Sequence, residues 1–428
     1  METIYALASG RGRAGVAVIR LSGAKSHSII ADLCGDVPPT RRASVRKLRW
    51  NNEVLDEALV LTFMPGASFT GEEAAELHIH GGTAVIAAVF SALRSFPDVR
   101  MAEAGEFTRR ALEAGRLSLH EVEGLVDLID AETEAQRKQA QRMMQGDLGK
   151  KVLEWREALL SITALIEATI DFSEEEIPAG LLGEVRLRLS VLVTGLQAEL
   201  SGVQMAERIR AGFEVAIFGP PNVGKSTLVN ALVGKDVAIT SEIAGTTRDI
   251  IETRLDLSGL PVLLLDTAGL RESVDPVEQE GIRRAYLRVS QADLRIMVID
   301  EEHADWNPGF DSDIVISSKA DNGWRKDGAL PVSAKSGNGV SDLRDWMTKR
   351  LMDLASLAGV VVNERHNAGV SAACDALQRA LHMVDQRGDV ELVAASLRES
   401  CGYLEALVGR IGVEDVLGEI FGRFCIGK

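Results

Sequence analysis

The sequence has few cysteines, few aromatic residues and no long hydrophobic run. Its four cysteines, Cys34, Cys374, Cys401 and Cys425, lie far apart and form no C-x-x-C pair, which gives a disulfide framework or a zinc site almost no support. Aromatic residues make up only 4% of the chain, so we expect mainly aliphatic packing. The hydrophobic stretch 83–93 is far shorter than the ~20 residues that cross a bilayer, and the N-terminus does not resemble a signal peptide. We therefore expect a cytoplasmic protein with reduced thiols and no membrane partner.

Positive charge is also in the minority. The 428 residues include 47 Lys and Arg against 63 Asp and Glu, a net charge of −16. This balance argues against adsorption of the whole surface to nucleic acid or anionic membranes, although a local basic groove remains compatible with it. The length predicts about two to four domains, and a hydrophobic content of 46% is sufficient for sizeable cores.

Three sequence patterns follow one another along the chain. Residues 1–117 mix short β-type runs with glycine and proline turns, which predicts an α/β or α+β domain. Hydrophobic residues recur every three or four positions over 118–210, which predicts long helices. Strands alternate with helices over 211–353, as is typical of a parallel sheet with crossovers, and helical periodicity returns over 354–428. Helical sequence on both sides of the α/β block predicts that one domain is inserted in another.

The segment Gly219-Pro-Pro-Asn-Val-Gly-Lys-Ser226 matches the pattern G-x-x-x-x-G-K-[ST]. It follows a hydrophobic strand and begins a helical run, which is the context that a phosphate-binding loop requires. Glycines let the backbone wrap around phosphates, whose charge meets free N–H groups at the helix start. Lys225 would reach the outer phosphates and Ser226 would bind Mg²⁺. A simple glycine turn before a helix is the alternative, and two further motifs argue against it.

The first of these motifs is Asp266-Thr-Ala-Gly269, which ends a hydrophobic strand and matches D-x-x-G, with the carboxylate facing Mg²⁺. The second is a pair of loops, 318–321 and 333–335, that resemble the base-reading N-K-x-D and S-A-K loops of GTPases. Asp321 would accept hydrogen bonds from the N1–H and amino group of guanine, a donor pair that adenine lacks. Ser318 stands in place of the usual Asn, which puts the rigidity of the loop in question but not the choice of base. We therefore expect GTP as the ligand.

The residue after D-x-x-G is Leu270, where Ras-like proteins carry a glutamine that orients water. Another base or cation must therefore stabilise the developing charge. The segment 241–249 predicts a switch loop, one of whose threonines completes the Mg²⁺ shell. Glu278 is a candidate for orienting water, but Asp275 and the following proline also make it the third residue of a capped helix. The local sequence alone favours the cap.

Several blocks together resemble the tRNA modification GTPases of the MnmE (TrmE) family. The blocks are 12–23, 68–72, 78–82, 105–110, 245–249, 266–271 and the tail Cys425-Ile-Gly-Lys428. The similarity runs from residue 3 to residue 428 with all blocks in family order. It implies an N-terminal α/β folate-binding and dimerisation domain over 1–117 and a helical domain over 118–210 and 354–428. A Ras-like P-loop GTPase domain over 211–353 would be inserted in the helical domain.

The resemblance also assigns roles to individual residues. Residues expected to contact GTP are Asn222, Val223, Gly224, Lys225, Ser226, Thr227, Ser241, Glu242, Ile243, Ala244, Gly245, Thr246, Thr247, Asp266, Thr267, Ala268, Gly269, Ser318, Lys319, Asp321, Ser333 and Ala334. Mg²⁺ would be held by Ser226 and Thr247. K⁺ would be held by Asn222, Ser241, Ile243 and Thr246. Folate would be held by Arg20, Glu76, Arg116 and Lys428. The residues assigned to catalysis are Lys225, Cys425 and Glu278, the last by the family's water-positioning role, which overrides the cap.

The resemblance implies a homodimeric, K⁺-dependent GTPase that works with the flavoprotein MnmG (GidA) in a heterotetramer. Together they would form an aminomethyl or carboxymethylaminomethyl group on the wobble uridine of certain tRNAs. The one-carbon unit would come from a tetrahydrofolate derivative, and FAD is expected only in the partner. Two alternatives stay open, a ribosome-assembly GTPase and a nucleotide-dependent scaffold in which hydrolysis is incidental.

Overall fold

The computed structural model describes residues 2–171, 181–237, 251–266, 283, 287–386, 389–408 and 427. Contacts divide the chain into two units, Met1–Val126 with Val408–Lys428, and Asp127–Leu407. The two units are described one after the other. Helix α4 (Leu119–Asp130) crosses the division.

The first unit is built on a six-stranded sheet in the order β3-β4-β5-β2-β1-β6. Its strands are β1 (Thr3–Leu7), β2 (Ala14–Ser22), β3 (Ser44–Trp50), β4 (Glu53–Phe63), β5 (Ala74–Gly81) and β6 (Val99–Met101). Only β1 and β6 pair in parallel. Helices α1 (Ser26–Cys34) and α2 (Thr83–Arg94) pack against this sheet, and α3 (Glu106–Glu113) follows β6. The polar alternation of the strands leaves Arg20 directly opposite Glu76 on neighbouring strands.

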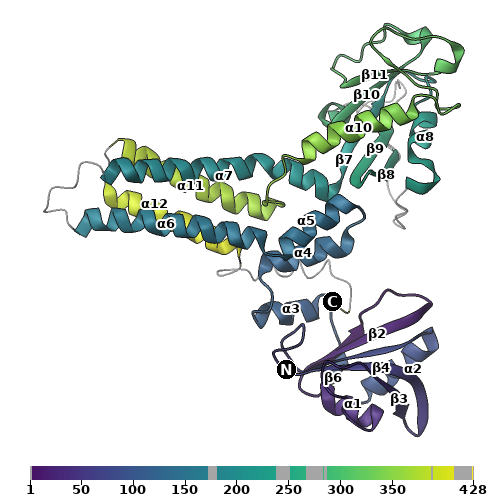
Figure 1. Cartoon of the computed structure of the whole chain (residues 1–428), viewed down its shortest axis with the longest axis vertical. Coiled ribbons are helices and arrows are strands. Elements are labelled where there is room, and N and C mark those ends of the chain that lie inside the picture. The colour runs from purple at the N-terminus through teal and green to yellow at the C-terminus, as the bar shows by residue number, and fades with distance from the viewer. Residues whose placement is uncertain are drawn as a thin grey trace. The chain divides into compact units, whose positions relative to one another are not determined.

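The second unit begins with a bundle of long helices (Figure 1). Its members are α6 (Asp147–Asp171), α7 (Leu181–Ala211), α11 (Glu364–Asp385) and α12 (Val390–Leu407), and the shorter α5 (Glu134–Met144) packs beside α6 and α7. Hydrophobic residues at helical spacing, such as Leu189 and Leu196 of α7 and Leu377 of α11, are fully buried. The helical periodicity that the sequence shows before residue 211 and after residue 354 therefore belongs to one bundle.

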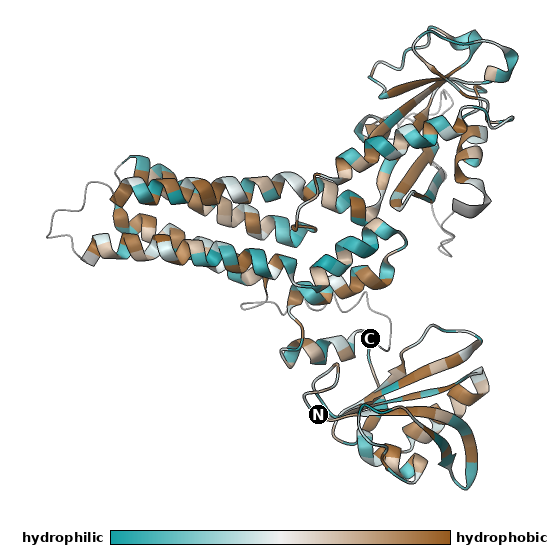
Figure 2. Cartoon of the chain, in the orientation of Figure 1, coloured by the Kyte–Doolittle hydropathy of each residue, from teal (hydrophilic) through white to brown (hydrophobic). Residues whose placement is uncertain are grey.

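The remainder of the second unit is a six-stranded sheet in the order β12-β11-β10-β7-β9-β8. Its strands are β7 (Phe213–Phe218), β8 (Ile251–Leu257), β9 (Leu260–Asp266), β10 (Leu294–Ile299), β11 (Ile314–Ser317) and β12 (Leu330–Pro331). Only β8 is antiparallel to its neighbour, β9. Helices α8 (Lys225–Val237) and α10 (Val340–Ala355) belong to the same part of the chain. Figure 2 shows that hydrophobic residues are concentrated on the strands of both sheets. The multidomain fold class expected from the sequence, α/β together with all-α, is confirmed.

The α/β part is inserted between α7 and α11 of the bundle. The chain enters it directly from α7 and returns through the crossover segment 356–363. This crossover lies very close to α7, because a Cβ on Gly202 would approach the carbonyl oxygen of Leu357 to 2.6 Å. The amide of Val360 also donates to the carboxylate of Glu199 at 3.1 Å. The domain boundaries expected from the sequence differ from the boundaries of the two units, and they stay a prediction.

Candidate nucleotide-binding site

The phosphate loop leaves the carboxyl end of β7, at the centre of the second sheet. A Cβ on Gly219 would lie 2.1 Å from the carbonyl oxygen of Val298 in β10, so no side chain fits at this position. Asn222 and Gly224 have positive φ angles of 64° and 99°, which helps to turn the backbone towards α8. The N–H groups at the start of α8 therefore face the space at the end of the strand, as a phosphate site requires.

Lys225 is buried at the start of α8 and is held by the loop itself. Its Nζ donates to the carbonyls of Gly219 and Pro220 at 2.9 and 2.8 Å. Burial lowers the pKa of Lys225, and the carboxylate of Asp266 opposes this shift only in part. Asp266 ends β9 and is buried, and β9 is the strand beside β7. The structure thus brings the phosphate-loop lysine and the D-x-x-G carboxylate together, and with Ser226 they form the hard-oxygen and cationic surroundings that suit a phosphate with Mg²⁺.

A cavity of about 410 Å³ joins the phosphate loop to the base-reading loops. It is lined by Val223, Gly224, Thr227, Leu228, Ile316, Ser318, Lys319, Asp321, Asn322, Val332, Ser333, Ala334 and Lys335. Asp321 lies at its wall, and a hydrogen bond from Ser333 lowers the pKa of that carboxyl group, with a smaller contribution from Lys335. Asp321 is therefore ionised at neutral pH, the form that accepts both hydrogen bonds from guanine.

Sequence reasoning missed one polar residue near this cavity. Asp300 directly follows β10, and its carboxylate binds the side chain of Lys319 at 2.7 Å. An acidic residue at the carboxyl end of a buried parallel strand was the available signal, because such ends gather at one edge of the sheet.

Several predicted site residues lie outside the described residues. They are Ser241, Glu242, Ile243, Ala244, Gly245, Thr246, Thr247, Thr267, Ala268, Gly269, Glu278, Cys425 and Lys428. The predicted K⁺ ligands are therefore represented in the described structure by Asn222, and the predicted Mg²⁺ ligands by Ser226.

The first unit contains a second predicted site. Arg20 of β2 and Glu76 of β5 form an ion pair at 3.0 Å with both side chains partly exposed. The guanidinium carbon of Arg20 lies 5.6 Å from the ring centre of Phe69 and 5.8 Å from that of Phe107. The adjacent His78 lies 3.4 Å from Glu76. A charged pair whose arginine lies over two aromatic rings is suited to a flat polar ligand.

The other predicted folate residues lie on connecting segments of this unit. Arg116 follows α3, and its side chain would contact a Cβ on Gly71 at 3.4 Å. Lys428 is not described, but its neighbour Gly427 is buried, and a Cβ there would lie 2.0 Å from the carbonyl oxygen of Leu7. The penultimate residue therefore packs against the end of β1, within the same unit as Arg20 and Glu76.

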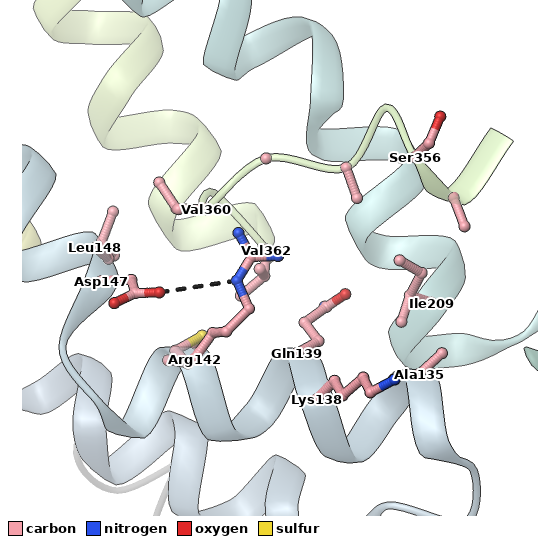
Figure 3. A pocket seen from close by; sticks show the side chains of 14 residues that line it. Ala135, Lys138, Gln139, Arg142, Asp147, Leu148, Ile209, Ser356, Val360 and Val362 are labelled. Carbon is pink, nitrogen blue, oxygen red and sulfur yellow. Dashed lines mark ion pairs between the residues drawn. The ribbon is translucent and has the colours of Figure 1, made fainter. Parts of the chain in front are cut away.

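A further cavity of about 260 Å³ lies in the second unit between α5, α7 and the crossover segment. Figure 3 shows Lys138, Gln139 and Arg142 of α5 on one side of it and Val360 and Val362 of the crossover on another. Arg142 is paired with Asp147 at 3.7 Å. None of the residues predicted from the sequence to bind a ligand lines this cavity.

The described residues contain neither a candidate metal cluster nor a candidate membrane span. Within these ranges, no group of three or more His, Cys, Asp or Glu side chains could hold a metal ion. Nδ1 of His80, for example, is paired with the carboxylate of Asp56 at 2.7 Å. Likewise, no helix in the described part of the chain is long and hydrophobic enough to span a membrane.

A phosphate loop and a carboxylate suited to guanine share one cavity at the carboxyl ends of parallel strands, which defines a P-loop GTPase. Comparisons with known proteins then define the family. The protein-family model of the MnmE helical domain matches residues 119–425. The protein-family model of the GTP-binding protein TrmE N-terminus matches residues 3–116. The chain therefore belongs to the MnmE (TrmE) family of tRNA modification GTPases.

Similar proteins include the tRNA modification GTPases MnmE of Cereibacter sphaeroides, 51% identical, and Ruegeria pomeroyi, 50% identical, each over 100% of both chains. Part of the chain is also similar to solved structures. Era in complex with MgGDPNP and a segment of 16S ribosomal RNA is 27% identical over 32% of this chain and 56% of that chain, with a TM-score of 0.26. The G domain of the FeoB iron transporter of T. maritima is 25% identical over 33% of this chain and 98% of that chain, with a TM-score of 0.24.

Proposed function

We propose that this GTPase acts in tRNA modification, together with a flavoprotein partner, MnmG (GidA). The two would form the aminomethyl or carboxymethylaminomethyl group at C5 of the wobble uridine of certain tRNAs. The observation that carries the proposal is the likeness to tRNA modification GTPases over the entire chain. We further propose that the protein is a cytoplasmic homodimer and joins the flavoprotein as a heterotetramer, with FAD in the partner.

Wobble-uridine analysis tests this function. tRNA from a strain that lacks the gene is digested and analysed by mass spectrometry after complementation with the wild-type chain or with Lys225→Ala. The wild type should restore the modified uridine and the variant should not. A wild-type chain that restores nothing would contradict the proposal. Restoration by Lys225→Ala would show that the protein acts as a scaffold, and a ribosome-assembly defect with normal uridine would support that alternative.

We propose that GTP hydrolysis depends on K⁺, held by Asn222, Ser241, Ile243 and Thr246, and on Glu278 as the residue that positions water. The support is Leu270, whose hydrocarbon side chain cannot orient water, so that a cation must stabilise the developing charge. Hydrolysis measured in KCl and in NaCl should differ by at least tenfold. Equal rates in the two salts, or an unaffected Glu278→Ala enzyme, would rule this mechanism out.

We propose that Arg20, Glu76, Arg116 and Lys428 hold a tetrahydrofolate derivative, with Cys425 near the transferred carbon. In support, Glu76 presents a partly exposed carboxylate paired with Arg20, whose guanidinium lies over two aromatic rings. A pterin ring is flat, with adjacent N–H donors that a carboxylate accepts. Binding of 5-formyl-tetrahydrofolate measured by calorimetry should be at least tenfold weaker in Glu76→Gln. The matched control is Glu57→Gln, since Glu57 is an exposed acid on the neighbouring strand β4. Equal affinity of the wild type and Glu76→Gln would contradict this site.

A further inference from the structure

The base-reading loop has an anchor that the sequence motif does not contain. In the N-K-x-D pattern the first residue is Asn, whose amide can donate two hydrogen bonds. Here the residue is Ser318, whose hydroxyl has one hydrogen. That hydroxyl is buried and donates to the carbonyl of Ile299 in β10 at 2.9 Å. The single hydroxyl hydrogen of Ser318 is therefore taken up by the bond to β10. Another contact has to hold the residues that follow Ser318 in the loop.

Lys319, the next residue, has an unfavourable backbone conformation that such a contact would stabilise. Its backbone is left-handed, with φ 55° and ψ 35°, which is unfavourable for residues other than glycine. Lys319 is one of the residues that line the nucleotide cavity. A strained residue at a binding site persists only where its surroundings hold it.

Asp300 supplies the contact from the end of β10. One carboxylate oxygen, Oδ2, accepts a hydrogen bond from Nζ of Lys319 at 2.7 Å. The other oxygen, Oδ1, lies 2.7 Å from Nδ1 of His303. The carboxylate side chain is 7% exposed, whereas that of Lys319 is 47% exposed. Burial acts to raise the pKa of Asp300, but the hydrogen bonds from Lys319 and His303 outweigh it and keep the pKa below its ordinary value.

We propose that Asp300 is a positioning residue for guanine, which holds the Lys319 side chain along the wall of the cavity and thereby places Asp321. His303 fixes the orientation of the Asp300 carboxylate. With its ammonium group held at Asp300, the hydrocarbon stem of Lys319 is kept in a single conformation against which the flat face of the base packs. Asp321 is two residues further on in the same short turn, so the same anchor sets the direction of its carboxylate. The proposal rests on GTP binding alone and not on the role in tRNA modification.

Binding of fluorescent GDP to the full chain tests the proposal by stopped-flow kinetics. Asp300→Ala should weaken GDP binding about tenfold, mainly through faster dissociation, because an ordered contact of the bound state is lost. Glu301→Gln is the matched control, since it removes the next carboxylate of the same turn, which is exposed. Binding by Asp300→Ala within twofold of the wild type would overturn the proposal.

Two further measurements separate positioning from general destabilisation. Lys319→Met keeps the hydrocarbon stem and removes the ammonium group, so it should reproduce the loss seen in Asp300→Ala. The double variant should lose less than twofold more than the weaker-binding single variant, whereas independent residues would multiply their effects. Because Lys319→Met leaves the buried acid in place, it carries the test even where Asp300→Ala impairs folding.

The second measurement is discrimination between GDP and IDP, which lacks the amino group that Asp321 reads. The preference for GDP should fall at least threefold in Asp300→Ala and in Lys319→Met. An unchanged preference with uniformly weaker binding would mean that Asp300 has a structural role only, and it would overturn the positioning role.

Discussion

The carbonyl oxygen of Val298 occupies the space that a side chain of residue 219 would require. A Cβ on Gly219 would approach it to 2.1 Å, so the first residue of the phosphate loop must be glycine. The contact joins the loop to β10, the strand whose end carries Asp300. The phosphate-binding and base-reading parts of the site are therefore in contact through the backbone.

Gly219→Ala is expected to move the phosphate loop away from β10. The substitution should weaken GDP binding at least tenfold and destabilise the protein by about 1–3 kcal/mol, as overpacking commonly does. The control is Gly195→Ala in α7, where a Cβ meets nothing within 4 Å and alanine should be neutral or stabilising by up to about 1 kcal/mol. Fluorescent GDP titration and urea unfolding measure the two effects. Wild-type affinity in Gly219→Ala would contradict the close contact.

Gly427→Ala is expected to impair wobble-uridine modification and to leave GTP hydrolysis intact. A Cβ at residue 427 would overlap the carbonyl of Leu7, and the φ of 109° is itself unfavourable for alanine. Residue 427 should move away from the end of β1, so wobble-uridine modification should fall at least tenfold while GTP hydrolysis stays within twofold. Gly10→Ala is the matched control, because a Cβ there has free space in the same unit. Normal modification by Gly427→Ala would show that the position of the tail is unimportant.

Because of Glu106, the first unit should lose stability as the pH falls into the acid range. Burial acts to raise its pKa, but hydrogen bonds from Arg100, the amide of Glu103 and Arg110 outweigh burial and lower the pKa to about 2. A carboxyl group with a depressed pKa stabilises the fold above the pKa of the unfolded chain, near 4.5, and this contribution is lost as the pH falls towards 2. The contribution should be on the order of 2 kcal/mol at pH 7.

Glu106→Gln should remove this pH dependence. The variant is expected to be less stable than the wild type at pH 7 and to approach it as the pH falls from 4.5 to 2. Urea unfolding can be followed through Trp50, which packs on Phe96 at 4.9 Å, in a background where the other tryptophans are phenylalanine. A constant difference between the two proteins over this pH range would contradict the assignment.

Gln136 has two separable functions at the start of α5. Its Oε1 accepts from the amide of Thr133 at 3.0 Å as part of a capping box, and its Nε2 donates to the carbonyl of Arg210 at the end of α7 at 2.9 Å. Gln136→Ala removes both and should cost about 1–2 kcal/mol. Gln136→Glu keeps the cap and loses only the donor, so it should be less destabilising. Thermal unfolding of the two variants gives the comparison, and an equal loss of stability would show that the cap contributes nothing.

The elements of the nucleotide site could be predicted because each depends on local sequence. Strands β7 and β10 lie in the block 211–353, where strands alternating with helices were predicted, since short hydrophobic runs between turns have few other solutions. Asp266 and Asp321 were predicted from motifs; Asp266 ends β9, and Asp321 lines the cavity beside the phosphate loop. A P-loop and its partner loops have fixed spacing because they all lie at the carboxyl ends of adjacent parallel strands.

Contacts between distant residues could not be predicted in this way. Arg110 binds Glu72 at 3.0 Å across a sequence separation of 38 residues, and the pair depends on how the first sheet folds. The bond between Lys319 and Asp300 depends on the order of strands β10 and β11. Without register and strand order, a charged residue in a loop looks the same whether it is paired or exposed.

The insertion of the α/β part into the helical bundle limits how the nucleotide can move it. The chain passes between the two parts twice, at the end of α7 and along the crossover segment, and the crossover lies against α7 at Gly202 and Leu357. Two attachments that lie side by side prevent the inserted part from swivelling freely, as a single flexible linker would allow. A change at the nucleotide site is therefore passed to the bundle along two stretches of chain, the end of α7 and the crossover segment.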